Sequence, residues 1–269
     1  MDWCNPSDDS EAIITPQAQI EDFLSKRGSE DGFGANERLL MLHTGFGVES
    51  LQSCWPVREE PFPVPAFLRK FPLYAVETDP PISLVEKVFG APMAVDVLEV
   101  AIAMGARQLF FFGLCGAIGD DLEIGDVVIP VEVKREEGTS YHYLPAKETV
   151  KPNRTCAGLL EEFLAKHEDI RVHTGHTVST DAVFRQTLNK ERGWRDEGII
   201  AVDMEMSAML AVAQFHKLPA VSVLVVSDKH ILKEQSEWNW GGQKLVEARA
   251  KMIRLFAEFI MSIGETEWK

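Results

Sequence analysis

Two acidic residues in the last third of the chain stand where carboxyl groups could act on a small molecule. Glu205 follows Met204 at the start of an apolar stretch that runs to residue 214 and predicts a helix. Asp228 comes directly after an apolar run over residues 220–227, which predicts a buried strand. A carboxylate can accept hydrogens from sugar hydroxyls, and a carboxyl group can protonate a departing base. The pair therefore indicates chemistry on a nucleoside.

Each of these residues also has an ordinary structural interpretation. A carboxylate at a helix start is favoured by the helix dipole by about 0.3–1 kcal/mol without any ligand, and an Asp after a strand often forms a turn. The neighbours of Glu205 are strongly apolar, however, and burial of an unpaired carboxylate among them is unfavourable. We therefore expect a ligand or partner for Glu205. We expect Asp228 to lie at the carboxyl edge of a sheet, with a raised pKa that keeps its proton near neutral pH.

The elements that position these residues alternate between strand and helix. The pattern predicts strands over residues 82–88, 108–114 and 126–133, with a helix over 93–104. A helix over 156–166, a strand over 171–179, a helix from 204, a strand over 220–227 and an amphipathic helix over 242–260 follow. This alternation predicts an α/β fold whose sheet is at least partly parallel.

The first third of the chain is less regular. Residues 1–36 are predicted to form a polar arm with one short helix over 17–26, and residues 38–44 a buried strand. Prolines crowd residues 55–81 and deny donors to a central sheet, which predicts a surface excursion that could act as a lid. No linker or repeat divides the remainder, so we expect residues 37–269 to form one domain.

The composition excludes several classes of protein. Of the 269 residues, 45% are hydrophobic and 26% charged, as in ordinary globular proteins. The net charge of −15 would repel a phosphate backbone, so nucleic-acid polymers are not expected as partners. Neither a signal peptide nor an apolar run of about 20 residues is present, so no membrane location is expected.

The cysteines and histidines give no sign of a metal site. Four cysteines occur without paired spacing, which favours a reducing cytoplasm over a disulfide framework: Cys4, Cys54, Cys115 and Cys156. His173 and His176 lie three positions apart on a predicted strand and point to opposite faces, so they cannot chelate one ion. No metal and no cofactor are therefore expected.

Several segments, in a fixed order, carry a resemblance to a known family. They are GAPMAVDVLEVAIAMGA with FFFGLCGAIGDDLEIGDVVIP, then KREEGTSYHYLP, HTVSTDAVF, AVDMEMSAML and VVSDKH. Together they resemble the nucleoside phosphorylase superfamily of purine nucleoside phosphorylases, uridine phosphorylases and methylthioadenosine nucleosidases, from about residue 82 to the C-terminus. The resemblance implies a three-layer α/β/α fold around a mixed, partly barrel-like central sheet. It also implies a homo-oligomer, whether dimer, trimer or hexamer.

The resemblance also implies roles for individual residues. Glu205 would accept both ribose hydroxyls with Met204 packed under the sugar, and Asp228 would protonate a purine at N7, a residue that uridine phosphorylases lack. Other substrate-binding candidates match the remaining family segments: Gly113, Cys115, Gly116, Arg135, His142, Thr180, Asp181 and Phe184. Phe184 could instead pack in the core, and the segment with Arg135 and His142 could be a solvated hairpin.

The chain departs from the family pattern where phosphorylases hold phosphate. The family has a glycine-rich loop and an arginine after the first strand, but here His43, Thr44 and Gly45 occur with no arginine nearby. A second family arginine aligns with Phe111, and the threonine of the same motif aligns with Leu114. Phenylalanine cannot supply the donors that a guanidinium offers to an anion.

Several functions therefore stay open. The first is phosphorolysis of a nucleoside, purine-leaning, to ribose 1-phosphate and free base. Inorganic phosphate would be the co-substrate, held by Arg135, Gly45 and an arginine from a neighbouring subunit or from the proline-rich segment. Close alternatives are uridine phosphorolysis and hydrolysis by water, as in a nucleosidase. An alternative of another class is a non-catalytic protein that binds or stores nucleosides, which the missing arginines favour.

Overall fold

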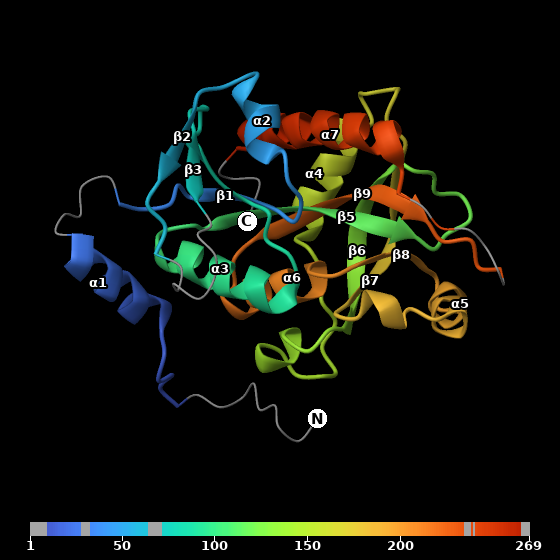
Figure 1. The fold of residues 1–269 in the computed structure, drawn as a ribbon, viewed down its shortest axis with the longest axis horizontal. Helices are drawn as coiled ribbons and strands as arrows, with labels where there is room; N and C mark the ends of the chain where they lie inside the picture. Colours follow the sequence, from blue (N-terminus) through green and yellow to red (C-terminus); the bar gives the residue numbers. More distant parts are fainter. Residues whose placement is uncertain (1–9, 28–32, 64–71, 234–237, 239, 265–269) are drawn as a thin grey trace.

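The computed structural model describes residues 10–27, 33–63, 72–233, 238 and 240–264 (Figure 1). The strands are β1 (Arg38–Leu42), β2 (Val57–Glu60), β3 (Leu73–Val76), β4 (Ile82–Glu86), β5 (Gln108–Ala117), β6 (Val127–Glu136), β7 (Val172–Thr180), β8 (Ile199–Asp203) and β9 (Ala220–Lys229). The α-helices are α1 (Pro16–Arg27), α2 (Gly47–Gln52), α3 (Ala91–Ala103), α4 (Arg154–Leu164), α5 (Leu188–Asp196), α6 (Met206–Phe215) and α7 (Gly242–Ser262), with 3-10 turns η1 (Ser140–His142) and η2 (Val183–Arg185).

One mixed sheet links all nine of these strands, in the order β2-β3-β4-β1-β5-β8-β7-β6-β9. Because β9 also pairs with β5, the strands β5, β8, β7, β6 and β9 close into a five-stranded barrel. Pairing is parallel between β4, β1, β5 and β9, and antiparallel between β5 and β8 and between β6 and β9. The expected three-layer α/β fold with a partly barrel-like sheet is confirmed.

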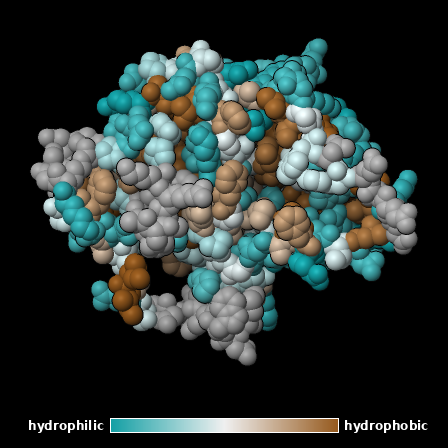
Figure 2. Space-filling model, in the orientation of Figure 1, coloured by the Kyte–Doolittle hydropathy of each residue, from teal (hydrophilic) through white to brown (hydrophobic). Residues whose placement is uncertain are grey.

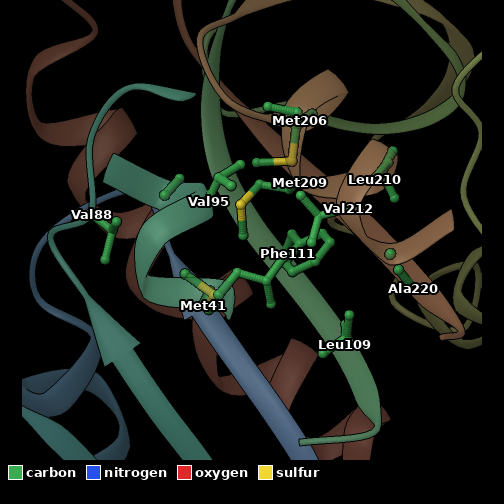
Figure 3. Close-up of a cluster of buried hydrophobic side chains, with 14 of the residues drawn as sticks. Met41, Val88, Val95, Leu109, Phe111, Met206, Met209, Leu210, Val212 and Ala220 are labelled. Carbon is green, nitrogen blue, oxygen red and sulfur yellow. The ribbon is translucent and has the colours of Figure 1, made fainter. Parts of the chain in front are cut away.

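Helices cover both faces of the sheet, which explains why β1 is buried at every position and why all of its residues after Arg38 are apolar. Leu39 and Met41 of β1 join the apolar cluster under α3 and α6, whereas Leu40 and Leu42 join the cluster under α4 and α7. Figure 3 shows part of the first cluster, where methionines of α6 pack against β1 and β5. The two clusters thus pack opposite faces of the same strands against helices.

The proline-rich stretch contributes two strands to the sheet, although we expected only a surface excursion. β2 and β3 form an antiparallel pair at the sheet edge, and β3 continues onto β4. The prolines flank these two strands and do not enter them, so the ladder keeps its donors. The part of the predicted excursion over residues 64–71 lies outside the described residues.

Most other predicted elements are confirmed to within a few residues. Further elements were not predicted from the sequence: α2, which has only six residues, α5, which is mostly polar, and β8, which has only five residues. β5 extends three residues beyond its predicted end, through Cys115 to Ala117, because its last residues pair with β8 and β9.

On the face shown in Figure 2, hydrophilic and hydrophobic side chains of the described residues are interspersed. No helix among these residues is both long and apolar enough to cross a membrane. Cys54, Cys115 and Cys156 are free thiols, and Cys4 lies outside the described part of the chain.

Candidate active site

A cavity of about 770 Å³ opens at the carboxyl ends of β5 and β9. The start of α6, the segment around η2 and the residues after β9 complete its walls. The polar side chains that line it are His43, Gln186, Glu191, Asp203, Glu205, Ser227, Asp228, Lys229, His230 and Lys233. Its volume lies within the range of about 300–1,000 Å³ that is typical of small-molecule sites.

Glu205 is held in place by the strand and turn that precede α6. Asp203, the last residue of β8, accepts hydrogen bonds at Oδ1 from the backbone N–H groups of Glu205 and Met206, each at 2.8 Å. Ser179 of β7 donates to the same oxygen at 2.8 Å. The Glu205 carboxylate in turn accepts a 2.7 Å hydrogen bond at Oε1 from the N–H of Gly90, at the start of α3.

This environment makes Glu205 an unusual carboxyl group. Burial, reinforced by the nearby charge of Asp203, raises the pKa of Glu205 to about 8. Burial also raises the pKa of Asp203 to about 6, although the hydrogen bonds that Asp203 accepts oppose this shift. Hydrogen bonding to an incoming polar group would offset the desolvation of Glu205, as a buried carboxyl group requires.

Asp228 lies at the end of β9 within a network of donors. Its Oδ2 accepts hydrogen bonds from His230 Nε2 at 2.8 Å and from Trp238 Nε1 at 2.6 Å, and its Oδ1 accepts one from Ser227 Oγ. His230 Nδ1 lies 2.9 Å from Glu191 Oε2. Both ring nitrogens therefore face carboxylate oxygens, an arrangement that suits an imidazolium that donates on both sides.

The pKa of Asp228 is shifted in the direction opposite to the one expected from the sequence. Burial acts to raise this pKa, but the hydrogen bonds from His230, Ser227 and Trp238 outweigh burial and lower it. Burial acts to lower the pKa of His230, yet its bonds to Asp228 and Glu191 raise that pKa to about 9. Near neutral pH the proton of this pair therefore resides mainly on His230.

Glycine at position 116 makes this network possible. A Cβ on Gly116 would lie 2.4 Å from His230 Nε2, so only glycine leaves room for the imidazole against β5. Asp228 pairs with Gly116 across the parallel strands. The resemblance assigned Gly116 to substrate binding, and the structure adds a packing reason for this residue.

His43 contributes a second, very different imidazole to the cavity wall. It follows β1, is 3% exposed, and its Nδ1 lies 2.8 Å from the carbonyl oxygen of Val88. Since a carbonyl only accepts, Nδ1 carries the hydrogen and Nε2 is left as an acceptor. Among the described residues Nε2 has no hydrogen-bond partner. Burial, opposed by the bond to Val88, lowers the pKa of His43 to about 4, so the ring is neutral.

The turn after β1 is occupied by an internal carboxylate. Glu86, at the end of β4, accepts hydrogen bonds at Oε2 from the N–H groups of Gly47 at 2.6 Å and Val48 at 3.1 Å. Lys87 lies 2.6 Å from the other oxygen of the same carboxylate. The resemblance places a phosphate-binding loop in this turn, and Glu86 already uses two of its backbone donors.

The structure brings some of the predicted site residues together and leaves others apart. The predicted residues that line the cavity are Cys115, Gly116, Phe184, Met204, Glu205 and Asp228, whereas Gly113, Arg135, His142, Thr180 and Asp181 are not among its lining. Phe184 is 97% exposed at the rim and does not pack in the core. The described residues within 55–81, which we considered as a lid, do not line the cavity either.

Arg135 is a buried structural residue and not a free anion donor. Its guanidinium donates to Ser140 Oγ at 2.8 Å, to the carbonyl of Leu144 at 2.8 Å and to the carbonyl of Pro145 at 2.7 Å. It thereby holds the loop after β6 in shape. The expectation that Arg135 holds phosphate is not supported by this geometry, because its donors are engaged within the loop.

Sequence reasoning missed several residues that shape the site. His230, Glu191 and Trp238 build the network around Asp228, Asp203 orients Glu205, and His43 presents an unused nitrogen. A usable signal existed only for His230, which stands two positions after Asp228 and so shares its strand face.

Comparison with known proteins agrees with this architecture. The model of the phosphorylase superfamily matches residues 37–260. A guanosine phosphorylase from Halorubrum lacusprofundi is 28% identical over 148 residues, which are 54% of this chain and 60% of that protein. A DeoD-type purine nucleoside phosphorylase from Exiguobacterium sp. is 27% identical over 149 residues, 55% of this chain and 62% of that protein. The chain thus spans about three fifths of the length of these curated relatives.

Two solved structures share the fold at low sequence identity. The purine nucleoside phosphorylase of Toxoplasma gondii, in complex with immucillin-H, superposes with a TM-score of 0.73 at 19% identity over 85% of this chain and 91% of its own. The uridine phosphorylase of Vibrio fischeri ES114 gives a TM-score of 0.70 at 19% identity over 84% and 91%. With the family model covering residues 37–260, the chain belongs to the phosphorylase superfamily.

Proposed function

We propose that this protein cleaves the N-glycosidic bond of a nucleoside by phosphorolysis, with a preference for purines. The observation that carries the proposal is the joint presence of Glu205 and Asp228 on the wall of one cavity. Glu205 offers a buried carboxyl group for sugar hydroxyls, and Asp228 is hydrogen-bonded to His230, whose pKa is raised to about 9 by its carboxylate partners. Cleavage of a base from a sugar needs these two kinds of group.

The relatives support phosphorolysis in particular. Relatives with detectable sequence similarity include a guanosine phosphorylase and purine nucleoside phosphorylases. Their names favour phosphate as the co-substrate, ribose 1-phosphate as the product and a purine as the leaving base. No cofactor enters this proposal.

The chemistry divides between the two ends of the cavity. As the bond between C1′ and the base nitrogen breaks, its electron pair moves onto the base, and the base takes one proton from the Asp228–His230 pair. The pair is treated as a unit because its groups titrate together. Glu205 holds the sugar while C1′ becomes oxocarbenium-like, and a nucleophile oxygen then bonds to C1′.

A second candidate, hydrolysis by water, is favoured by the turn after β1. There Glu86 accepts hydrogen bonds from the Gly47 and Val48 amides, and a carboxylate repels an incoming phosphate. The described residues that line the cavity include lysines and histidines but no arginine. Water is neutral, so as a nucleophile it needs neither arginine nor a loop of free backbone N–H groups.

We also propose a cytoplasmic location and a homo-oligomeric state. The free thiols Cys54, Cys115 and Cys156 fit a reducing compartment. The exposed aromatic rim of the cavity fits contact with a second subunit.

Base release from a panel of nucleosides tests the proposal. Inosine, guanosine, adenosine, methylthioadenosine and uridine are each incubated with and without inorganic phosphate, and free base is measured. We expect phosphate-dependent release that is faster from purine nucleosides than from uridine. Release that ignores phosphate would select hydrolysis, and binding without release would select a storage or binding protein.

The Asp228→Asn variant, assayed with the same nucleosides, tests the role of Asp228, and Asp121→Asn is its control. We expect purine release to fall about 10²- to 10⁴-fold, the usual contribution of general acid catalysis. Asp121→Asn, at an exposed position outside the cavity, should leave the rate unchanged. Equal rates for the Asp228 variant and the unmodified protein would contradict the role given to Asp228.

A further inference from the structure

We propose that His43 Nε2 accepts the proton of the nucleophile that attacks C1′, an inference that rests on the proposed glycosidic cleavage. The nucleophile carries an O–H group in either form of the reaction, whether it is water or hydrogen phosphate. The role of His43 is therefore the same for both nucleophiles, and assays with and without phosphate distinguish them.

The hydrogen-bonding state of His43 prepares it for this role. Its Nδ1 hydrogen is committed to the Val88 carbonyl at 2.8 Å, so the ring cannot flip or exchange tautomers without losing that bond. The Nε2 lone pair is buried and has no partner among the described residues. Because His43 is one of the residues that line the cavity, a ligand bound there is the donor that this acceptor would receive.

His43 lies next to the group that is proposed to hold the sugar. It contacts Val88, whereas Glu205 accepts a hydrogen bond from Gly90, two residues further along the same segment. The two side chains thus anchor both sides of Phe89, which itself lines the cavity. His43 therefore belongs to the sugar end of the site.

The sheet places His43 and Asp228 at separate ends of the cavity. β1 and β9 flank β5 on opposite sides, so they stand about 10 Å apart by two interstrand spacings. His43 also lies three residues earlier along β5 than Asp228, because Leu42 pairs with Phe112 and the same register brings His43 level with Gly113, whereas Asp228 pairs with Gly116. A nucleoside can then point its base toward Asp228 and its sugar toward His43.

The step balances with the groups present. The nucleophile oxygen forms the bond to C1′ and releases its proton to His43 Nε2, while the C1′–N electron pair leaves with the base. The base is protonated by the Asp228–His230 pair. Water yields ribose and hydrogen phosphate yields ribose 1-phosphate, and His43 is left as an imidazolium that returns its proton to solvent.

Two substitutions separate this role from a structural one. His43→Asn keeps an amide N–H close to the position of Nδ1, and with it the bond to Val88, but removes the acceptor at Nε2. His43→Gln instead keeps a hydrogen-bond acceptor, an amide oxygen, near the position of Nε2 and gives up the bond to Val88; this oxygen can orient the nucleophile but cannot take its proton. If Nε2 accepts the proton, activity should fall in the order unmodified, Gln, Asn, with kcat of the Asn variant reduced about 10²-fold or more and KM changed little.

Chemical rescue provides a readout that a structural role would not move. Azide is a nucleophile that carries no proton, so it needs no acceptor. We expect added azide to increase base release by His43→Asn, with formation of ribosyl azide, and to change the unmodified protein far less. Each assay is run with and without phosphate, which identifies the natural nucleophile.

The outcomes separate cleanly. Two results would overturn the role of His43 in a protein that still releases base. One is an Asn variant that is more active than the Gln variant, and the other is an Asn variant that azide does not rescue. Absence of base release by the unmodified protein in every arm overturns the proposed function and the role of His43 with it. Calorimetric titration of the Asn variant with inosine confirms that the folded site is retained.

Discussion

At the scale of single residues, the site separates two carboxyl groups by their surroundings. Glu205 is buried beside another acid, which raises its pKa to about 8, whereas Asp228 is buried among donors, which lower its pKa. Pairs of acids whose pKa values are pushed apart are typical of active sites, because one can hold a substrate while the other serves in proton transfer. Because its pKa is raised, the ionised form of Glu205 destabilises the folded protein.

The pH dependence of stability should reveal this feature of Glu205. The folded-state pKa, about 8, lies above the ordinary value of 4.5, so the folded protein keeps a proton that the unfolded chain has lost. Stability is therefore lost as pH rises from about 4.5 to 8, by up to about 1.4 kcal/mol per pH unit. Glu205→Gln has no such titration. We expect its free energy of unfolding, relative to the unmodified protein, to increase over this range and to level off above pH 8.

Urea unfolding at pH 5, 7 and 9 measures this difference. Glu162→Gln, at an exposed position on α4, is the control and should give a difference that is independent of pH. A Glu205→Gln difference that is equally flat would contradict the raised pKa.

At the scale of elements, the site depends on the passage from β8 into α6. Asp203 ends β8 and accepts the first free N–H groups of α6, which need a partner at any helix start. Ser179 of the neighbouring β7 donates to the same carboxylate oxygen and accepts from the N–H of Ser207. Two strands and a helix thus converge on one side chain, which sets the direction of Glu205.

Removal of this cap should weaken both stability and binding. We expect Asp203→Ala to lower the free energy of unfolding by about 1–2 kcal/mol, the usual effect of losing a helix cap. KM for the nucleoside should rise as well, because Glu205 loses its orientation. Urea unfolding and initial rates measure the two effects together.

The control for this experiment is Asp196→Ala. Asp196 is exposed at the end of α5 and accepts no hydrogen bond from the start of a helix, so both quantities should stay unchanged. An Asp203 variant that loses stability with KM unaffected would show that the cap does not position Glu205.

At the scale of the whole molecule, barrel closure builds the cavity from distant segments. Pairing of β9 with β5 brings Asp228 beside Gly116, and pairing of β5 with β1 adds His43. The cavity rim then carries side chains that water solvates poorly: Phe89, Val183, Phe184, Ile231, Trp238 and Trp240. A rim of this kind is typical of a surface that contacts another molecule.

We expect that contact to be made by a second copy of the chain. Sedimentation at micromolar concentration should then give a mass that is a multiple of 30.1 kDa. Phe184→Asp, which places a charge at the most exposed position of the rim, should shift the distribution toward the single chain. A single species of 30.1 kDa for the unmodified protein would contradict this expectation.

The sequence by itself determined the α/β fold, most of its strands and helices, and the places of Glu205 and Asp228. Those features depend on local patterns: apolar periodicity defines the elements, and an acid at a helix start or strand end is visible in a few consecutive residues. The edge strands β2 and β3 were hidden by flanking prolines, and β8 and α5 by their short or polar sequences.

Only the tertiary structure decided the protonation states and the partners of the site. Arg135 lies in a segment that resembles the family, yet its guanidinium donates to the carbonyl groups of Leu144 and Pro145 in the loop after β6. Glu191 lies 39 residues from His230 and still holds its ring, and Val88 lies 45 residues from His43 and selects its tautomer. A pKa depends on burial and on every charge or donor within a few ångströms, and barrel closure, not chain order, determines which groups come that close.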